Sequence, residues 1–247
     1  MRSAEGEVPL ASFQWAAATD PLDEHTLAAV AAGVSTRRYA STLDPVPSEV
    51  TERATSSSAV SRRFVALSTK RLQAFLDRPL GELDLRVVCI DGKVFRDHCM
   101  VIALGIDTQG RKHVLGLREG ATETAAVTTG LLGDLVTRGL PTDRTVLFVI
   151  VQRLGLTGAL QRTLRTTNII ENLNGSVERY SRNVKRWRGG QMIQRWVASA
   201  LVEAEKRFRR VRGYRDLQHL VRTWSAPSTR CVPLTAWLLT WRNMMTS

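Results

Sequence analysis

Apolar side chains recur every three or four positions in two stretches near the start of the chain. This spacing predicts amphipathic helices over residues 27–43 and 58–76. The segment DPVPSEV lies between them and is typical of a break in helical structure. The second stretch follows the run TSSS, in which every residue is a suitable helix N-cap. We therefore expect a helical region over residues 1–80.

The second of these helices has two arginines near its start. Val60, Phe64 and Leu67 share one face, which leaves Arg62 and Arg63 at other positions. Arginine and small polar side chains at the start of a helix are typical of the recognition helix of a helix-turn-helix protein. An ordinary amphipathic helix with two exposed arginines explains the pattern equally well, and both interpretations stay open.

From Gly81 onward the apolar pattern changes to alternation and to short β-branched runs. It predicts a first strand that ends at Asp91, a turn at Gly92 and Lys93, and two further antiparallel strands over residues 98–107 and 112–120. A helix then begins near residue 122 and ends at GLP, residues 139–141.

The apolar run TVLFVIV, residues 145–151, predicts a fourth strand. A helical crossover makes this strand parallel to the first. The β-β-β-α-β order, with an acidic residue at the end of the first strand, is the layout of a ribonuclease H-like core. We therefore expect an α/β fold of the mixed α+β kind, with this core over residues 81–222 and a tail of unknown role over residues 223–247.

Asp91 is the first candidate for chemistry. Carboxylates at the ends of two neighbouring parallel strands can share the Mg²⁺ ions of a phosphoryl transfer. Asp-Gly is also among the strongest hairpin signals, and spacing alone favours a turn at this position.

Charge is divided unevenly along the chain. Residues 1–150 hold 17 Lys and Arg against 18 Asp and Glu, whereas residues 151–247 hold 18 against 5. Sixteen of those 18 basic residues are arginines, whose planar guanidinium groups suit phosphate oxygens. Nucleic acid is the partner that this excess favours over a merely solvated basic face.

A helix with a second candidate carboxylate follows. Asn168 and Glu171 have the spacing of a capping box, which is a structural explanation for Glu171. The apolar residues that predict the helix share one face: Ile170, Leu173, Val177, Tyr180, Val184 and Trp187. The basic residues lie elsewhere on its surface: Arg179, Arg182, Lys185, Arg186 and Arg188.

Two long blocks resemble the mutator-type transposases of bacterial insertion sequences. The first is IDGKVF followed by VIALGIDTQGRKHVLGLREGATE, and the second is RTTNIIENLNGSVERYSRNVKRWRGGQMIQRWVASALVEAEKRFRRVRGYRDL. The resemblance extends from about Gly33 to Val221. It implies a metal-dependent DNA strand-transfer enzyme with an Asp-Asp-Glu site, in which Asp91 is the first aspartate and Glu171 the glutamate.

The same resemblance implies partners and a cofactor. It implies Mg²⁺ or Mn²⁺ at Asp91 and Glu171, and duplex DNA with the element's terminal inverted repeats as the substrate. The helical region would recognise those ends, with Arg62 and Arg63 in its recognition helix, and the arginine-rich helix would add phosphate contacts.

The chain departs from the family pattern at the second aspartate. The family has this residue just after the fourth strand, followed by a helical stretch with a Cys-x-x-His motif. Here neither Asp nor Glu occurs between Asp143 and Glu171, and Cys-x-x-His is absent from the sequence. An internal deletion explains both absences, and it leads us to expect impaired catalysis and self-association through uncovered apolar surface.

Other features of the sequence narrow the class of protein. The three cysteines form neither a disulfide framework nor a zinc motif. Since no apolar run approaches the roughly 18 residues of a membrane span, we expect a soluble protein without a membrane partner. The resemblance implies a cytoplasmic, nucleoid-associated bacterial protein. Three functions remain: an active transposase, a non-catalytic DNA-binding remnant that inhibits an intact copy, and an unrelated RNA-binding protein.

Overall fold

The computed structural model describes residues 2–3, 6–7, 22–44, 55–120, 125–141, 146–150 and 168–217. The chain divides into two compact units, Met1–Lys70 and Arg71–Ser247. The first unit holds the short strands β1 (Arg2–Ser3) and β2 (Gly6–Glu7), helix α2 (Leu22–Ala31), the 3-10 turn η1 (Tyr39–Thr42) and the first part of helix α3 (Ser57–Leu76). The second unit holds the end of α3 and the following elements: strands β3 (Leu85–Phe95), β4 (His98–Asp107), β5 (Lys112–Gly120) and β6 (Leu147–Ile150), helices α4 (Ala125–Thr137), α6 (Asn168–Ser181) and α7 (Gly190–Glu205), and the 3-10 turn η2 (Tyr214–Asp216).

The predicted helix over residues 27–43 is wrong in its extent. Helix α2 ends at Ala31, because Gly33 takes a φ of 99° and the Val34 N–H donates to the Ala29 carbonyl at 2.9 Å. This is the hydrogen-bond pattern of a helix C-terminus closed by a left-handed glycine. Tyr39 of η1 then packs back into the unit, fully buried, with its hydroxyl 2.8 Å from Thr26 Oγ1.

Helix α3 begins where the serine run predicts. The Ala59 N–H donates to Ser56 Oγ at 3.3 Å, which makes Ser56 a side-chain cap for the first turn. Val60 and Phe64 are buried on the predicted apolar face, and Leu67 is partly buried. Among the described helices, none is both long enough and apolar enough to span a membrane.

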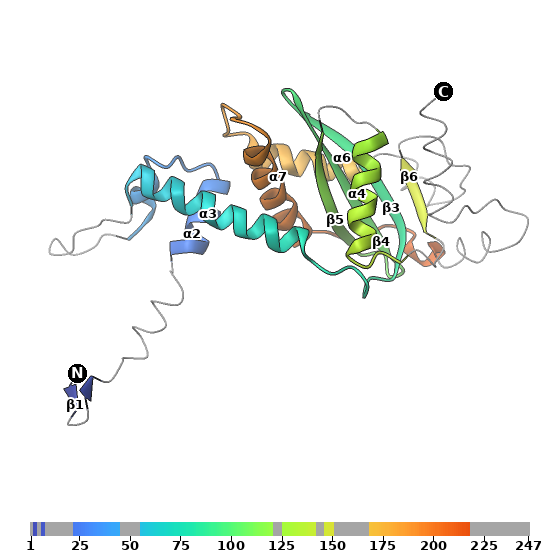
Figure 1. Cartoon of the computed structure of the whole chain (residues 1–247), viewed down its shortest axis with the longest axis horizontal. Helices are drawn as coiled ribbons and strands as arrows, with labels where there is room; N and C mark the ends of the chain where they lie inside the picture. Colours follow the sequence, from blue (N-terminus) through green and yellow to red (C-terminus); the bar gives the residue numbers. More distant parts are fainter. Residues whose placement is uncertain are drawn as a thin grey trace, which may run out of the picture. The chain divides into compact units, whose positions relative to one another are not determined.

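The four longer strands form one sheet in the order β5-β4-β3-β6 (Figure 1). Strands β3, β4 and β5 are antiparallel neighbours, and β6 pairs parallel with β3 from Val87–Leu147 to Ile90–Ile150. The bounds of β4 and β5 coincide with the predicted ranges, and β6 lies within the predicted fourth strand. The mixed α/β fold and the parallel crossover are thus confirmed.

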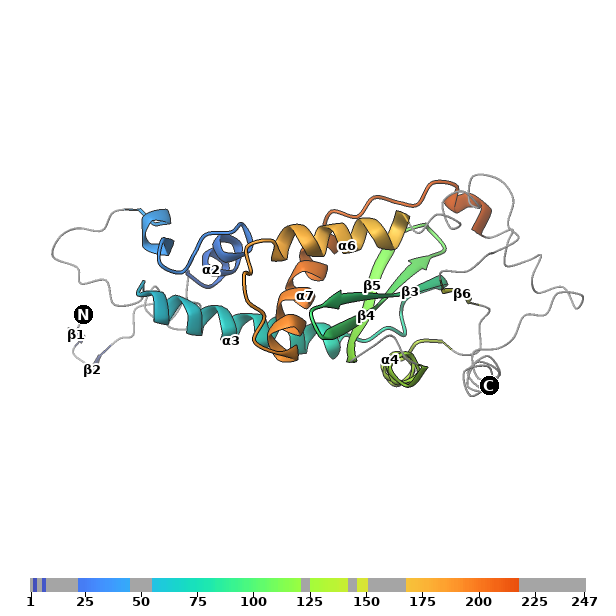
Figure 2. The same ribbon diagram turned by 90° about the horizontal axis from the view of Figure 1, so that it is seen from above.

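Helices cover both faces of the sheet (Figure 2). Helix α4 lies on one face, where Leu131, Leu132 and Leu135 join the inward side chains of β3, β4 and β5 in a buried cluster. Helices α6 and α7 cover the other face and supply the second cluster. Helix α4 ends as predicted at Gly139, which takes a φ of 94°.

The predicted turn at Gly92 and Lys93 is wrong. Strand β3 continues through Asp91 to Phe95, and Asp91 pairs with Ile102 inside the antiparallel ladder. The chain reverses instead at Arg96 and Asp97, between the paired residues Phe95 and His98, with Arg96 at a φ of 54°. Continuous pairing with β4 therefore overrides the local preference of Asp-Gly for a turn.

The predicted helix through Trp187 is also too long. Helix α6 ends at Ser181, whose hydroxyl donates to the Val177 carbonyl at 2.8 Å. Trp187 lies beyond the helix but still reaches the core, where its ring meets that of Phe95 edge to face at 5.3 Å. Apolar spacing persists past the helix end because the connection to α7 packs on the same sheet face.

Candidate functional site

Asp91 lies where the parallel part of the sheet ends. The preceding residue, Ile90, makes the last pair with β6, and Asp91 is the next residue of β3. Its side chain is partly buried, between full exposure and the closed interior. The sheet therefore places this carboxylate at the carboxyl end of two adjacent parallel strands, as the sequence predicts.

Helix α6 brings two polar residues to Asp91. The Asn174 amide donates from Nδ2 to Asp91 Oδ2 at 2.8 Å, although the two residues are 83 positions apart. Glu171 precedes Asn174 by one helical turn and is exposed in the first turn of α6. Its negative charge acts on Asp91 and raises the pKa of that carboxyl group. The two predicted carboxylates are thus brought together.

Burial is the main influence on the pKa of Asp91. It raises the pKa of the carboxyl group, and the charge of Glu171 adds to this effect. The hydrogen bonds from the Asn174 amide and the Gly92 backbone N–H oppose it, as does the positive charge of Lys93. The net effect is a raised pKa of Asp91. The hydrogen bonds and the charge of Lys93 therefore do not fully offset the cost of burying the ionised carboxylate.

A second polar contact joins β3 and α6. Lys93, two residues after Asp91, forms an ion pair with Glu178 at 2.6 Å. Glu178 follows Asn174 by one turn, so the same side of α6 faces successive outward positions of β3. Sequence reasoning missed Asn174, Lys93 and Glu178. The spacing of residues 171, 174 and 178 does place Glu171, Asn174 and Glu178 on one face of α6.

The donor atoms at this place are oxygens. Cys89 lies two residues before Asp91, but burial and the charge of Asp91 raise the pKa of its thiol to about 12, which keeps it protonated. The Asn174 Oδ1 atom is buried and has no hydrogen-bond partner in the described part of the chain. An uncompensated carboxylate, a second carboxylate and an unsatisfied amide oxygen fit a hard cation such as Mg²⁺ or Mn²⁺.

The described residues contain no group of three or more His, Cys, Asp or Glu side chains able to hold a metal. Asp107 does not extend the pair, because it lies at the opposite end of the sheet, where it pairs with Leu85. Its carboxylate accepts hydrogen bonds from the Arg111 guanidinium at 2.7 Å and from backbone N–H groups of its own turn. The pair of Asp91 and Glu171 is therefore what the described chain offers to a metal.

The two arginines near the start of α3 differ in their surroundings. Arg62 is exposed, whereas the Arg63 side chain is 18% exposed and lies 3.5 Å from the Asp23 carboxylate of α2. Arg63 thus has a partner within its own unit. Arg62 is the more accessible of the two for a nucleic acid.

The basic residues after Glu171 fall on two kinds of structure. Arg179 lies on α6, and the others lie in the connection between α6 and α7: Arg182, Lys185, Arg186 and Arg188. All five are exposed. Trp187 anchors the connection against Phe95, four residues beyond Asp91 and therefore about 13 Å along the strand.

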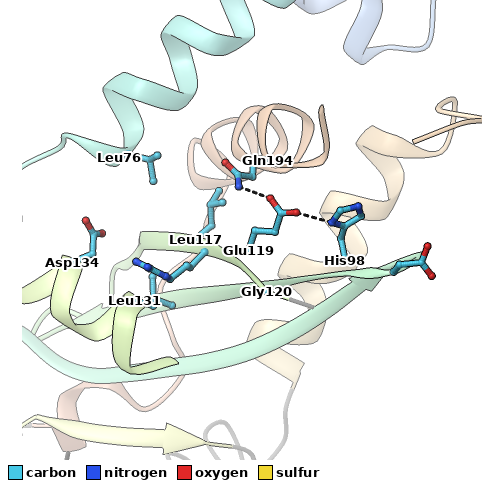
Figure 3. A pocket seen from close by; sticks show the side chains of 10 residues that line it. Leu76, His98, Leu117, Glu119, Gly120, Leu131, Asp134 and Gln194 are labelled. Atoms are coloured by element: carbon cyan, nitrogen blue, oxygen red, sulfur yellow. Dashed lines mark hydrogen bonds and ion pairs between the residues drawn. The ribbon is translucent and has the colours of Figure 1, made fainter. Parts of the chain in front are cut away.

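A pocket of about 690 Å³ lies at the end of β5, and sequence reasoning missed it (Figure 3). Within it the Glu119 carboxylate is 2.6 Å from His98 Nδ1 and accepts a hydrogen bond from Gln194 Nε2 at 2.7 Å. The same carboxylate rests against Gly190, where an added Cβ would lie 1.7 Å from Glu119 Oε1. A carboxylate at a helix N-terminus is favourable, so Glu119 fixes the start of α7 and the end of the basic connection.

Comparisons with known proteins agree on one family. Residues 14–165 match the family model described as "Transposase, Mutator family", which covers more than half of the chain, includes Asp91 and ends before Glu171. The transposase for insertion sequence element IS406 of Burkholderia multivorans (strain ATCC 17616 / 249) is 36% identical over an alignment of 115 residues, and the match covers 44% of this chain. The matched part spans 29% of that relative's length.

Proposed function

Because the chain belongs to the mutator family of transposases, we propose that it binds DNA at the ends of an insertion sequence through a ribonuclease H-like core and a helical N-terminal region. The activity of the family is metal-dependent strand transfer by a polynucleotidyl transferase. The described residues offer two carboxylates, Asp91 and Glu171, to a metal, and we propose that the chain alone does not carry the reaction through.

One observation carries the proposal: α6 places Asn174 and Glu171 at Asp91, beyond the last parallel pair of β3 and β6. The sheet order β5-β4-β3-β6, with three antiparallel strands and one parallel edge strand, supports the ribonuclease H-like assignment. Carboxylates at this end of the sheet are where two-metal phosphoryl transfer requires them.

Asp91 and Glu171 would hold one Mg²⁺ or Mn²⁺, since this cation is commonly bound through one or two carboxylates and retains several waters. When bound, the ion supplies charge stabilisation for the oxygens of a phosphoryl group. Asn174 orients Asp91 and favours its ionised form through the hydrogen bond to Oδ2. Lys93 adds a positive charge on the same strand.

The proposed impairment follows from the missing second aspartate. Neither Asp nor Glu occurs between Asp143 and Glu171, and Asp143 itself lies outside the described residues. Asp107 is engaged by Arg111 and His113 at the far end of the sheet. Without a third carboxylate, the residues of this chain would not hold a second metal ion in a fixed position, and the orientation on which the rate depends would be lost. An internal deletion is the simplest origin of this arrangement.

DNA contacts are proposed at two places. Helices α2 and α3 are the candidate helix-turn-helix-like pair, with Arg62 exposed near the start of α3. The five exposed basic residues of α6 and its connection to α7 are the second place, and they suit phosphate contacts. The expected substrate is duplex DNA with terminal inverted repeats, and self-association through uncovered apolar surface is expected.

A second candidate function is a non-catalytic DNA-binding protein that occupies the element's ends and inhibits an intact transposase. The exposed basic side chains beside an incomplete carboxylate set favour it specifically. Family membership removes the third hypothesis, an unrelated RNA-binding protein.

Two titrations of the purified chain test the proposal. Mn²⁺ should bind with a stoichiometry of one in paramagnetic resonance titrations, and Asp91→Ala should abolish binding, whereas Asp97→Ala in the exposed β3–β4 turn should not. Gel shifts should show binding to duplex DNA that weakens steeply as salt rises. Absence of Mn²⁺ binding, or of DNA binding at about 50 mM salt, would refute the corresponding half of the proposal.

A further inference from the structure

A second strongly basic segment follows α7 and is separate from the residues considered above. Residues 206–215 contain neither Asp nor Glu. Their charged side chains are all exposed: Lys206, Arg207, Arg209, Arg210, Arg212 and Arg215. We refer to residues 206–215 as the basic ribbon.

The backbone of the basic ribbon is tied to the sheet. The Val211 N–H donates to the Gly110 carbonyl in the β4–β5 turn at 2.9 Å, and the Val211 side chain is buried. Gly110 has a φ of +73°, and a Cβ added there would lie 2.3 Å from Tyr214 Cβ. The ribbon is therefore packed closely on a turn that only glycine permits, and its arginines project from a fixed backbone.

The aromatic side chains of the ribbon are already engaged. Phe208 and Tyr214 pack against the core, with Lys112 Nζ 5.5 Å from the centre of the Phe208 ring and the Arg210 guanidinium 5.8 Å from that of Tyr214. Hydrogen bonds from Arg215 and Arg210 lower the pKa of the Tyr214 hydroxyl. Since both rings pack against the core and are only partly exposed, the ribbon offers guanidinium groups to a ligand more readily than a stacking platform for bases.

The carboxylates just before the ribbon are directed elsewhere. Glu203 pairs with Arg71 at 3.0 Å and Glu205 pairs with Arg78 at 2.8 Å, both at the end of α3. Glu203 also reaches Lys206, the first residue of the ribbon. Glu203 and Glu205 are thus both engaged by arginines at or just after the end of α3.

The ribbon lies away from the carboxylate pair. It contacts the β4–β5 turn, at the end of the sheet where Asp107 pairs with Leu85, and Leu85 is six residues, or about 20 Å, before Asp91. Figure 2 shows the chain after α7 running beside the sheet to η2. Helix α7, with 16 residues and a length of about 24 Å, separates the ribbon from the basic connection at residues 182–188.

We propose that the basic ribbon is a further DNA-binding surface that contacts the phosphates of duplex DNA without reading base sequence. The proposal rests on the proposed function, since it takes duplex DNA as the partner. Exposed arginines on a fixed backbone, with aromatic rings that pack against the core, favour backbone contacts over base contacts. A duplex that reaches both ends of α7 spans about 24 Å, or about seven base pairs at 3.4 Å each.

Salt titration of the full chain tests this surface. Arg207→Gln/Arg209→Gln removes two exposed charges of the ribbon, and Arg96→Gln/Arg118→Gln removes two exposed charges elsewhere on the second unit as the matched control. We expect the ribbon variant to reduce the slope of log affinity against log salt by about 1.8, since each phosphate contact contributes about 0.9. The reduction should be equal for an element end and for an unrelated duplex, and the control should keep the wild-type slope.

Two results would overturn the inference while leaving the proposed function intact. In the first, the wild-type protein binds DNA and the ribbon variant shows the same slope of log affinity against log salt as wild type. The other is a loss confined to single-stranded RNA, which would assign the ribbon to a different partner. Wild-type protein that binds no DNA refutes the proposed function itself. Thermal melting of each variant, with an unchanged midpoint expected, separates lost contacts from lost folding.

Discussion

At the scale of single residues, Asp91 is a carboxylate that the folded protein only partly compensates. Burial and the neighbouring charge of Glu171 outweigh the hydrogen bonds from Asn174 and Gly92, so its pKa lies above the ordinary value. A folded-state pKa above the unfolded one means that ionisation costs stability once the pH exceeds the ordinary value. A bound cation would remove that cost.

Asp91→Asn should therefore stabilise the metal-free protein at neutral pH. The amide keeps an oxygen to accept the Asn174 hydrogen bond but carries no charge. The gain should be full above the raised pKa of Asp91 and should disappear as the pH falls below the ordinary aspartate range, where both states are protonated. Urea unfolding with a chelator, from pH 3 to 8, measures it.

The control is Asp97→Asn in the exposed β3–β4 turn, which should change the free energy of unfolding by less than about 0.5 kcal/mol. An Asp91→Asn protein that is less stable than wild type at pH 7 contradicts the account of this carboxylate.

Asn174 should control how well Asp91 binds a metal. Removing its amide with Asn174→Ala takes away a hydrogen bond that favours the ionised carboxylate. Loss of such a supporting partner typically weakens metal affinity about 10- to 100-fold. We expect that loss in Mn²⁺ titrations at pH 7, with a smaller loss at higher pH, where Asp91 is ionised regardless.

Asn172→Ala, an exposed position on the same helix, should retain wild-type Mn²⁺ affinity. Equal affinity in all three proteins would show that Asn174 only packs α6 against the sheet.

Part of this site was predictable from the sequence and part was not. Asp91 follows a buried strand, and Glu171 opens a helix, so each is identified by its local context. The contact between Asn174 and Asp91 depends on how α6 crosses the sheet, which no local pattern records. The ion pair of Arg63 with Asp23 was not predictable for the same reason, because Asp23 lies on another helix.

At the scale of elements, the start of α7 depends on a glycine. A side chain at Gly190 would overlap the Glu119 carboxylate, whose oxygens are held by His98 and Gln194. Gly190→Ala should therefore lower the free energy of unfolding by about 1–3 kcal/mol, the cost of unsatisfied buried polar groups. Chemical denaturation measures this loss.

Gly175→Ala is the matched control, since Gly175 lies inside α6 with open space where a Cβ would be. It should raise stability by about 0.5–1 kcal/mol through helix propensity. A stabilising effect at both positions would show that Glu119 does not constrain α7.

The strands were predicted better than the helices. Short apolar runs form β4 and β5, and the turn between them has Gly110 at positive φ, so the bounds of both strands can be read from the sequence. The predicted helix over residues 27–43 and the one through Trp187 were too long, because apolar spacing continues where the backbone has already left the helix to pack on a neighbour. Asp-Gly at Asp91 misled for the opposite reason: pairing with β4 extends the strand through a local turn signal.

At the scale of the whole chain, the mixed fold and the family agree with the sequence-based expectation. The order of the strands follows from short connections and one helical crossover, which constrain topology strongly. The pocket beside Glu119 was not predictable, because it joins segments that are distant in sequence. The charge of the basic ribbon is visible in the sequence, but its packing on the β4–β5 turn is not. The proposed loss of the second aspartate, by contrast, rests on the sequence alone, which has neither Asp nor Glu between Asp143 and Glu171.

The central claim is that this chain retains one carboxylate pair and DNA-binding surfaces but lacks catalysis on its own. The direct measurement incubates purified protein with a labelled element end and Mg²⁺ or Mn²⁺, and resolves the products on a denaturing gel. We expect a shifted complex without cleavage or joining. Metal-dependent nicking or strand transfer that disappears in Asp91→Ala would contradict the claim and show that the chain is a complete enzyme.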